Sequence, residues 1–288
     1  MTAHNILISG ATGFIGRSYL QYNKTHNFFS ITNERRALTD INIPSSETIH
    51  SLRSFILKNK IDAIIHLATK FIRNDDFEQL NTLVDANYKL PMKLLAATEN
   101  TNVEKFIYVG SSWEKSHHNA KIAKNLYASV KKSFDSIADY WSCNSNVQIS
   151  KLTLFDTFGP FDDRNKIVDL IINARKKTLK INDPNQLINL SYSVDICMAL
   201  DCLIQLDEKD KTVNEYVVKS SEEMSIKELV TLTQNILNKK LRIEFGNCED
   251  VKHFIPVTNL PLVPGWNQQY TLRDGLVEKI ALDGSYGD

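Results

Sequence analysis

This 288-residue chain has no excess of charge of either sign. Lysine and arginine together number 34, and aspartate and glutamate together also number 34, so the formal net charge is zero. Proteins that bind nucleic acids usually carry a basic excess or a basic stripe, so this balance argues against nucleic-acid binding. A local basic pocket for a small anion is still compatible with it.

Cysteine is scarce, and long apolar runs are absent. The four cysteines form no C-x-x-C pair and no zinc-finger spacing, which indicates free thiols in a reducing compartment. No apolar run approaches the length of a membrane span, and Met1–Asn5 offers no basic region of a signal peptide. We therefore expect a cytoplasmic protein with no membrane partner. Apolar residues make up 42% of the chain, which excludes disordered and fibrous classes.

Short apolar segments alternate with helical patterns through the first half of the chain. The expected strands are residues 5–9, 28–32, 61–67, 105–109 and 147–154. Helical spacing lies between them, as in 83–98 and 126–141. This alternation predicts βαβ units and a parallel sheet that is covered on both faces.

After Pro160 the pattern changes. Helices are expected over 166–176, 195–206 and 225–237, and strands over 214–218 and 241–245. The predicted fold class is α/β, with a Rossmann-like doubly wound parallel sheet and a smaller mixed C-terminal substrate domain. We place the dinucleotide-binding domain at 1–160, with roughly 190–220 returning to it, and the substrate-binding portion at 161–288.

A glycine loop follows the first expected strand and opens a helix. Gly10 permits a tight turn, Gly13 lets the backbone approach a pyrophosphate, and Gly16 lets the helix pack on the strand. The N–H groups at the start of that helix would face the anion. In this strand–turn–helix context the loop predicts dinucleotide binding rather than an ordinary turn.

The end of the second strand selects between the two nicotinamide dinucleotides. NAD enzymes usually carry an acid there for the ribose 2′-hydroxyl, whereas an arginine accommodates a 2′-phosphate. Here the strand ends at Asn33, and Arg35 and Arg36 follow, which favours NADP(H). Two alternatives stay open: the arginines lie on a solvated face, or Glu34 takes the acidic role.

A tyrosine and a lysine stand four residues apart in the helical pattern after the fourth strand. The spacing places Tyr127 and Lys131 on one face, where an ammonium would favour the phenolate and lower the pKa of the phenol. Ser111 and Ser112 directly follow the fourth strand, where ligands gather in such sheets, and a serine there can polarise a carbonyl. The alternative for either serine alone is turn chemistry or helix capping.

Together these motifs resemble the extended short-chain dehydrogenase/reductase family. The matching segments, in chain order, are Gly10-x-x-Gly13-x-x-Gly16, His66-Leu67-Ala68, the serine after the fourth strand, and Tyr127-x-x-x-Lys131. Residues 154–160, 192–195, 264–266 and 271–276 are similar to later motifs of the nucleotide-sugar members. The resemblance covers nearly the whole chain.

The resemblance implies a Ser–Tyr–Lys site over a nicotinamide ring. Ser111 matches the family's Ser/Thr, Tyr127 would exchange a proton with the substrate oxygen, and Lys131 would hold the nicotinamide ribose. The other implied cofactor contacts are Thr12, Gly13, Phe14 and Ile15 at the pyrophosphate, Leu67, Ala68 and Thr69 beneath the cofactor, Asp40 near the adenine, and Thr157 and Pro160 at the nicotinamide end.

The resemblance also limits which of the family's reactions are expected for this chain. Dehydratases of this family carry an Asp-Glu pair after the catalytic Thr, but Ser112-Trp113 stand here, so dehydration is not expected. Epimerase-reductases that resemble GDP-fucose synthase need a Cys where Trp113 stands. Residues 110–113, 158–162 and 186–189 resemble CDP-abequose and CDP-paratose synthases, which reduce C4 of a CDP-linked 4-keto-3,6-dideoxyhexose with NADPH. We therefore predict an NADPH-dependent 4-ketoreductase of a nucleotide-linked 6-deoxy- or 3,6-dideoxyhexose. The alternatives are an NAD-dependent 4-epimerase and a non-catalytic NADP(H) sensor or scaffold.

Substrate contacts are predicted at scattered polar positions. They are Lys70, Ser112, Trp113, Asp156, Arg164, Lys166, Gln186 and Lys252. Relatives usually have Asn at the position of Asp156, and Lys252 would replace a diphosphate-binding Arg as a point charge. Arg164 is equally a candidate for a surface salt bridge.

Two further expectations concern metal and assembly. His117 and His118 read as an exposed loop pair rather than as acid/base groups, and neither has metal-ligand spacing with a third partner, so we predict no metal. The apolar face of 83–95 suits the helix packing through which relatives often form dimers, so we expect a homodimer.

Overall fold

The computed structural model describes residues 2–32, 39, 41–72, 77–116, 119, 121–160, 162–208, 210–246, 256 and 259–284. The chain divides into two units. Unit 1 comprises Met1–Leu154, Cys197–Val217 and Ile255–Trp266, and unit 2 comprises Phe155–Ile196, Val218–Phe254 and Asn267–Asp288.

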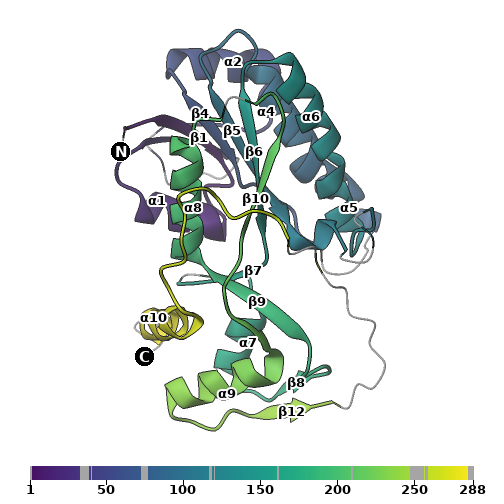
Figure 1. Cartoon of the computed structure of the whole chain (residues 1–288), viewed down its shortest axis with the longest axis vertical. Coiled ribbons are helices and arrows are strands. Elements are labelled where there is room, and N and C mark those ends of the chain that lie inside the picture. Colours follow the sequence, from purple (N-terminus) through teal and green to yellow (C-terminus); the bar gives the residue numbers. More distant parts are fainter. Residues whose placement is uncertain are drawn as a thin grey trace. The chain divides into compact units, whose positions relative to one another are not determined.

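Unit 1 is built on a seven-stranded sheet (Figure 1). Its strands are β1 (Asn5–Ser9), β2 (Asn27–Ile31), β3 (Ile41–Ile43), β4 (Ala63–His66), β5 (Lys105–Ser111), β6 (Gln148–Leu154) and β10 (Asn214–Val218). Their order in space is β10-β6-β5-β4-β1-β2-β3, and the pairs from β6 to β3 are parallel. This is the predicted doubly wound α/β sheet, so the fold class is confirmed.

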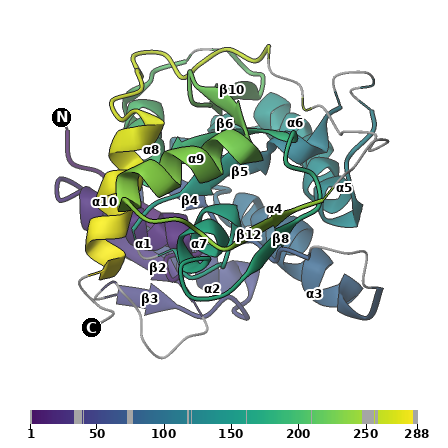
Figure 2. The ribbon, with the colours of Figure 1, turned by 90° about the horizontal axis from the view of Figure 1, so that it is seen from below.

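Helices cover both faces of this sheet (Figures 1 and 2). They are α1 (Phe14–Tyr22), α2 (Ile49–Lys58), α3 (Leu80–Val84), α4 (Leu90–Ala97), α5 (Leu126–Ser133), α6 (Asp135–Asn144) and α8 (Ser193–Gln205), most of which belongs to unit 1. On one face α2, α4 and α6 pack together over an apolar core that includes Leu52, Leu94 and Phe134. On the other face Tyr19 of α1 donates a hydrogen bond to Asp201 of α8 at 2.6 Å.

Two of the predicted helices are interrupted. The expected helix over 83–98 contains a π-helical turn, η2 (Asp85–Lys89), between α3 and α4. Pro91 lies in the first turn of α4 and has no N–H to donate to the carbonyl four residues earlier, which gives a local reason for the irregular turn. The expected helix over 126–141 is divided at Phe134, where α5 ends and α6 begins. Short 3₁₀ turns also occur at η1 (Phe77–Gln79) and η3 (Ser112–Glu114).

Among the described residues of unit 2 are two small sheets and three helices. The strands are β7 (Asp156–Phe158), β8 (Leu179–Ile181), β9 (Leu187–Tyr192), β11 (Glu223–Ser225) and β12 (Ile243–Phe245), and the helices are α7 (Ile167–Asn173), α9 (Ile226–Leu237) and α10 (Leu272–Gly284). One sheet has the order β11-β9-β7 with an antiparallel and a parallel pair, and the other pairs β12 with β8. The helices and sheets share a core around Phe158, Ile171 and Leu229.

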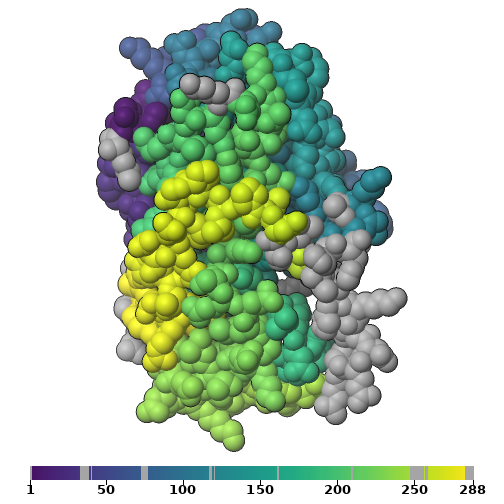
Figure 3. Space-filling model, viewed as in Figure 1, coloured from purple at the N-terminus to yellow at the C-terminus, as the bar shows by residue number. Residues whose placement is uncertain are grey.

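The chain returns to unit 1 twice after β9. Residues 214–218 supply the edge strand β10, and residues 259–266 run along it, where the Val217 N–H donates to the Pro261 carbonyl at 2.9 Å. Figure 3 shows the second of these segments at the surface of the molecule.

Candidate active site

The glycine loop is the tightest connection in unit 1. Gly10 has φ +80, a conformation that side chains rarely adopt, and a Cβ placed on it would lie 2.5 Å from the Ala68 backbone nitrogen. A Cβ on Gly16 would lie 2.2 Å from the Gly10 carbonyl oxygen. The loop after β1, the loop after β4 and the start of α1 therefore share a space that admits backbone only.

The start of α1 fits an anionic group. Gly13 is the N-cap residue and has no side chain with which to satisfy the first N–H groups of the helix. These groups and the helix dipole favour a negative charge at this point. Thr12 and Ile15 are half-buried beside it, Phe14 is buried, and Gly13 is exposed. A dinucleotide pyrophosphate fits this cradle.

The sheet order places this loop where open α/β sheets bind ligands. β1 and β4 are neighbours in the sheet, although β2 and β3 separate them in the sequence, so the strand order reverses between them. Ligands bind beyond the carboxyl ends of strands at such a reversal. The two strand ends are joined by a 2.7 Å hydrogen bond between Ser9 Oγ and His66 Nδ1, both of which are buried.

The loop after β4 is held by an asparagine that the sequence interpretation missed. Asn87 lies in η2, accepts a hydrogen bond from Thr69 Oγ1 at 2.6 Å, and donates one to the Lys70 carbonyl at 2.9 Å. Its side chain is buried. An asparagine inside an apolar helical pattern was the available clue, but only the irregular turn of η2 shows why it faces this loop.

Burial gives His66 an acid-sensitive role in stability. Burial and, to a smaller extent, the nearby Lys131 ammonium lower the pKa of His66 to about 3. The unfolded chain takes up a proton at this residue below about pH 6.5, whereas the folded chain resists it. The contribution of neutral His66 to folding is therefore present above about pH 6.5 and is lost as the pH falls towards the folded-state value.

We expect the substitution His66→Gln to reduce the acid sensitivity of folding. Thermal unfolding of the variant should change less than that of the wild type between about pH 7 and about pH 5, because glutamine does not titrate. His50→Gln, at an exposed position of α2, is the control and should leave the acid sensitivity unchanged. Equal acid sensitivity of His66→Gln and the wild type would show that burial of His66 does not contribute.

Tyr127 and Lys131 lie one turn apart on α5, and both side chains are buried, with exposed fractions of 8% and 9%. The helix begins at Asn125, whose side chain accepts a hydrogen bond from the Ala128 N–H at 3.0 Å. The Tyr127 ring packs edge-on against Phe71, with ring centroids 5.1 Å apart. α5 also packs against β5 and η3, so Ser111 and Tyr127 belong to adjoining elements.

Ser111 ends β5 and caps η3. Its hydroxyl accepts a hydrogen bond from the Trp113 N–H at 3.3 Å, and its own N–H donates to Glu114 Oε1 at 2.6 Å. Helix capping was the alternative role for this serine, and the structure shows that contact. The hydroxyl keeps its own proton to donate, so capping is compatible with polarising a carbonyl. Ser112 is buried, and Trp113 is half-buried against Phe71 at a ring-centroid distance of 5.8 Å.

A buried cluster of charged side chains lies behind Ser111, and the sequence interpretation missed it too. Lys151 Nζ, from the middle of β6, contacts Glu114 Oε2 at 2.6 Å and Asp135 Oδ2 at 2.8 Å. Glu215 of β10 lies 3.6 Å from the same ammonium. The clue was a lysine in the otherwise apolar strand over 147–154.

Three of the predicted residues of unit 2 lie on or contact strand β7. Asp156 and Thr157 lie in β7, and Arg164 Nη2 donates to both the carbonyl and the hydroxyl of Thr157 at 2.8 and 2.9 Å. Arg164 also forms an ion pair with Asp162 at 2.6 Å, the salt bridge that was its alternative role.

The other predicted residues of unit 2 flank this group or lie apart from it. Pro160 is buried two residues after β7, and Lys166 is the N-cap residue of α7. Gln186 precedes β9 at its amino end, whereas Asp156 pairs with Leu190, four residues and about 13 Å further along that strand.

Several predicted positions lie outside the described residues. They are Asn33, Arg35, Arg36, Asp40, Lys252 and the pair His117 and His118. The selection between NAD and NADP, the adenine contact and the diphosphate contact at Lys252 therefore stay predictions.

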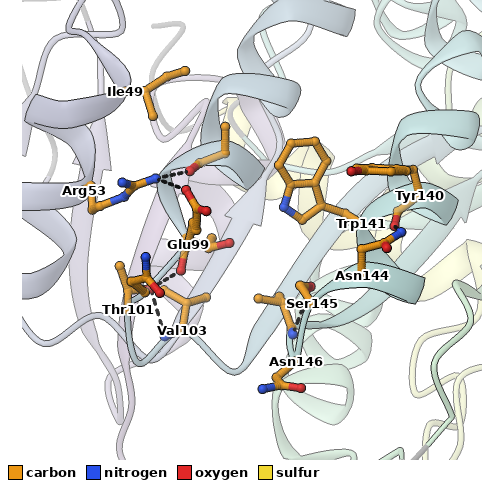
Figure 4. Close-up of a pocket in the computed structure, with 14 residues that line it drawn as sticks. Ile49, Arg53, Glu99, Thr101, Val103, Tyr140, Trp141, Asn144, Ser145 and Asn146 are labelled. Atoms are coloured by element: carbon orange, nitrogen blue, oxygen red, sulfur yellow. Dashed lines mark hydrogen bonds and ion pairs between the residues drawn. The ribbon is translucent and has the colours of Figure 1, made fainter.

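A cavity lies at the other end of the sheet from the glycine loop (Figure 4). It has a volume of about 660 Å³ and is lined by Arg53, Glu99, Tyr140 and Trp141, among others. Val103 and Val147, which also line it, precede β5 and β6, so the cavity is at the amino ends of these strands. Because ligands of such sheets gather at the carboxyl ends, this cavity is not the dinucleotide site.

Comparison with known proteins agrees with this geometry. The model of the NAD dependent epimerase/dehydratase family matches residues 6–218. The chain belongs to this family. The match confirms the resemblance to extended short-chain dehydrogenases/reductases that the motifs gave. Within the described residues, no helix is long and apolar enough to cross a membrane.

The relatives are nucleotide-sugar proteins by name. CDP-abequose synthase of Yersinia pseudotuberculosis is 28% identical over 87% of this chain and 91% of its own length. The protein of the same name from Salmonella typhimurium is 24% identical over 95% of this chain and 96% of its own length. A UDP-N-acetylglucosamine 4-epimerase from Methanobrevibacter ruminantium M1, solved with UDP-N-acetylmuramic acid, superposes with a TM-score of 0.83 at 19% identity, covering 99% of this chain and 100% of that one. This last likeness establishes the fold alone.

Proposed function

We propose that this protein is an NADPH-dependent reductase of a nucleotide-linked 4-keto-6-deoxyhexose, with a 3,6-dideoxyhexose as the leading candidate sugar. The observation that carries the proposal is the buried pair Tyr127 and Lys131 on α5, a helix that packs against β5, the strand that Ser111 ends. A phenol and an ammonium in this arrangement suit proton transfer to a developing alkoxide.

The chemistry assigns a role to each of the three residues. Ser111 donates a hydrogen bond to the C4 carbonyl oxygen of the sugar and polarises it. When bound, NADPH would supply the hydride for C4 and become NADP⁺. Tyr127 gives its proton to the C4 oxygen, so the ketone becomes an alcohol and the phenolate is reprotonated from solvent. Lys131 holds the nicotinamide ribose and stabilises the phenolate with its positive charge.

Two observations favour reduction over the other reactions of the family. Ser112 and Trp113 offer no carboxylate at the two positions after Ser111, so the acid and base of an elimination are missing there. The two relatives with the highest identity quoted above are both named CDP-abequose synthase. An NAD-dependent 4-epimerase is the second candidate, because the family whose model matches residues 6–218 is described as NAD dependent epimerase/dehydratase.

One assay, the oxidation of NADPH followed by its absorbance, tests both the proposed cofactor and the proposed substrate class. We expect loss of NADPH absorbance with a CDP-linked 4-keto-3,6-dideoxyhexose, and a higher kcat/KM with NADPH than with NADH because Arg35 and Arg36 follow β2. The same assay is run with UDP-, dTDP- and GDP-linked 4-keto sugars. Nucleotide sugars that carry a hydroxyl rather than a ketone at C4 are also tested. Interconversion of C4 epimers without net NADPH consumption would favour the epimerase instead, and a strong preference for NADH would contradict the assignment of the arginines.

A further inference from the structure

We propose that Glu114 is a positioning residue of this site: one of its oxygens fixes the backbone of Ser111, and its negative charge, buried against Lys151, offsets the positive charge of the buried Lys131. The inference rests on the proposed function for the roles of Ser111 and Lys131. It adds a residue that neither the family resemblance nor the relatives' names assign.

The first observation is the contact between Glu114 and Ser111. Glu114 Oε1 accepts the Ser111 N–H at 2.6 Å, and the Ser111 hydroxyl accepts the Trp113 N–H in return, so the two residues close a capping box around η3. Both contacts restrict the backbone from which the Ser111 hydroxyl projects. A carboxylate that accepts a backbone N–H at this distance forms a strong, directional hydrogen bond.

The second observation is that the Glu114 carboxylate is buried and has a fixed partner. Its other oxygen, Oε2, lies 2.6 Å from Lys151 Nζ, and both side chains are only 2% exposed. Lys151 reaches this position because Gly110 lacks a side chain: a Cβ there would lie 2.5 Å from Lys151 Cε. Two ions taken out of water persist only when each has partners that offset the loss of hydration.

The third observation is the electrostatic setting of Lys131. Burial lowers the pKa of Lys131 below that of a free lysine, and the Lys151 ammonium of β6 acts in the same direction. Glu114 of η3 is the strongest opposing influence, and Asp135 of α6 is a weaker one. His66 of β4 also faces Lys131, but it is neutral because burial lowers its own pKa. The carboxylate that binds the Ser111 backbone is thus also the one that most favours the Lys131 ammonium.

Glu215 offers a matched control. It is a second carboxylate near Lys151, at 3.6 Å, and it also binds Thr153 Oγ1 at 3.0 Å and forms an ion pair with Lys115. It makes no hydrogen bond to Ser111 in the described part of the chain, and Asp135 and Glu114 are the carboxylates that act on Lys131. Glu215→Gln therefore removes a charge from the same cluster without touching either proposed function of Glu114.

The test compares Glu114→Gln with Glu215→Gln in the full chain. The first readout is the pH dependence of NADPH affinity, which follows Lys131 through its contact with the nicotinamide ribose and needs no sugar substrate. The second is the pH profile of kcat/KM on a 4-keto sugar. We expect Glu114→Gln to move the alkaline limb of both profiles to lower pH by about one unit, because a neighbouring opposite charge shifts a pKa by roughly that amount or more. Glu215→Gln should leave both limbs in place.

A conservative variant separates charge from position. Glu114→Asp keeps the negative charge but shortens the side chain, so the alkaline limbs should remain at the wild-type pH while kcat falls because the Ser111 contact is lost. This variant also serves if Glu114→Gln does not fold. The proposal is wrong if the alkaline limbs shift as much in Glu114→Asp as in Glu114→Gln. It is also wrong if Glu215→Gln shifts them as much as Glu114→Gln does. In either case Glu114 would only help to hold the cluster together.

The two readouts distinguish this inference from the proposed function. If the wild type reduces no 4-keto sugar but Glu114→Gln still shifts the NADPH binding profile, the assigned reaction is wrong and the role of Glu114 stands. If the wild type is an active reductase but neither profile shifts, the reaction stands and the role of Glu114 is wrong.

Discussion

Replacing Tyr127 by phenylalanine should lower kcat by about 10²–10⁴-fold, the range that a positioned general acid contributes. The variant keeps the aromatic ring, which packs against Phe71, and loses only the hydroxyl that would protonate the C4 oxygen. NADPH affinity should change little, because Lys131 and the loop at Gly10 remain intact. Single-turnover reduction of a 4-keto sugar and NADPH fluorescence titration measure the two effects separately.

A second tyrosine on the neighbouring helix provides the control. Tyr140 lies on α6 with 61% of its surface exposed, and Tyr140→Phe removes the same atom far from the carboxyl end of β5. Its kcat should equal that of the wild type. Full activity of Tyr127→Phe would show that another group protonates the sugar, and a parallel loss of NADPH affinity would show that the phenol acts in cofactor binding.

The fold could be predicted well from the sequence because the parallel strands are buried on both faces. Such strands appear as short apolar runs, and five of them, in β1, β2, β4, β5 and β6, were located to within a few residues. In unit 2 the three-residue strands β7, β8 and β11 gave no pattern to detect, whereas β12, which is equally short, lies within the predicted strand over 241–245. The interruption at η2 has a local cause in Pro91, whereas the break at Phe134 occurs at a residue that does not by itself end helices.

The site residues that could be predicted from the sequence are those that stand at a characteristic short spacing along the chain. Gly10 and Gly16 follow a strand at fixed intervals, and Tyr127 and Lys131 stand one helical turn apart, so each pair is visible in a short window. Glu114 and Lys151 are 37 residues apart and meet only because β5 and β6 are neighbours in the sheet. A buried ion pair of this kind is a product of the tertiary structure, and a single sequence gives no spacing from which to infer it.

Replacing Lys151 should strongly destabilise unit 1. Substitution by methionine keeps the length and apolar stem of the side chain but leaves Glu114, Asp135 and Glu215 around a position with no positive charge. Removing one partner of a buried ion pair costs about 3–5 kcal/mol of unfolding free energy, because the remaining charges stay buried and uncompensated. Denaturant unfolding of the full chain, followed by a probe in unit 1, measures this loss.

The pH dependence of the loss tests its cause. Burial already raises the pKa of Glu114 in the presence of Lys151, and without the ammonium the Glu114 carboxylate should take up a proton at still higher pH. Because the pKa of the folded variant then exceeds that of the unfolded chain, the penalty is largest above the folded-state pKa and shrinks as the pH falls through it. Lys89→Met, which removes an exposed lysine paired with Asp85, should cost less than about 1 kcal/mol at any pH. A stability gap between Lys151→Met and the wild type that stays constant from neutral to acidic pH would mean that lost packing, rather than uncompensated charge, destabilises the variant.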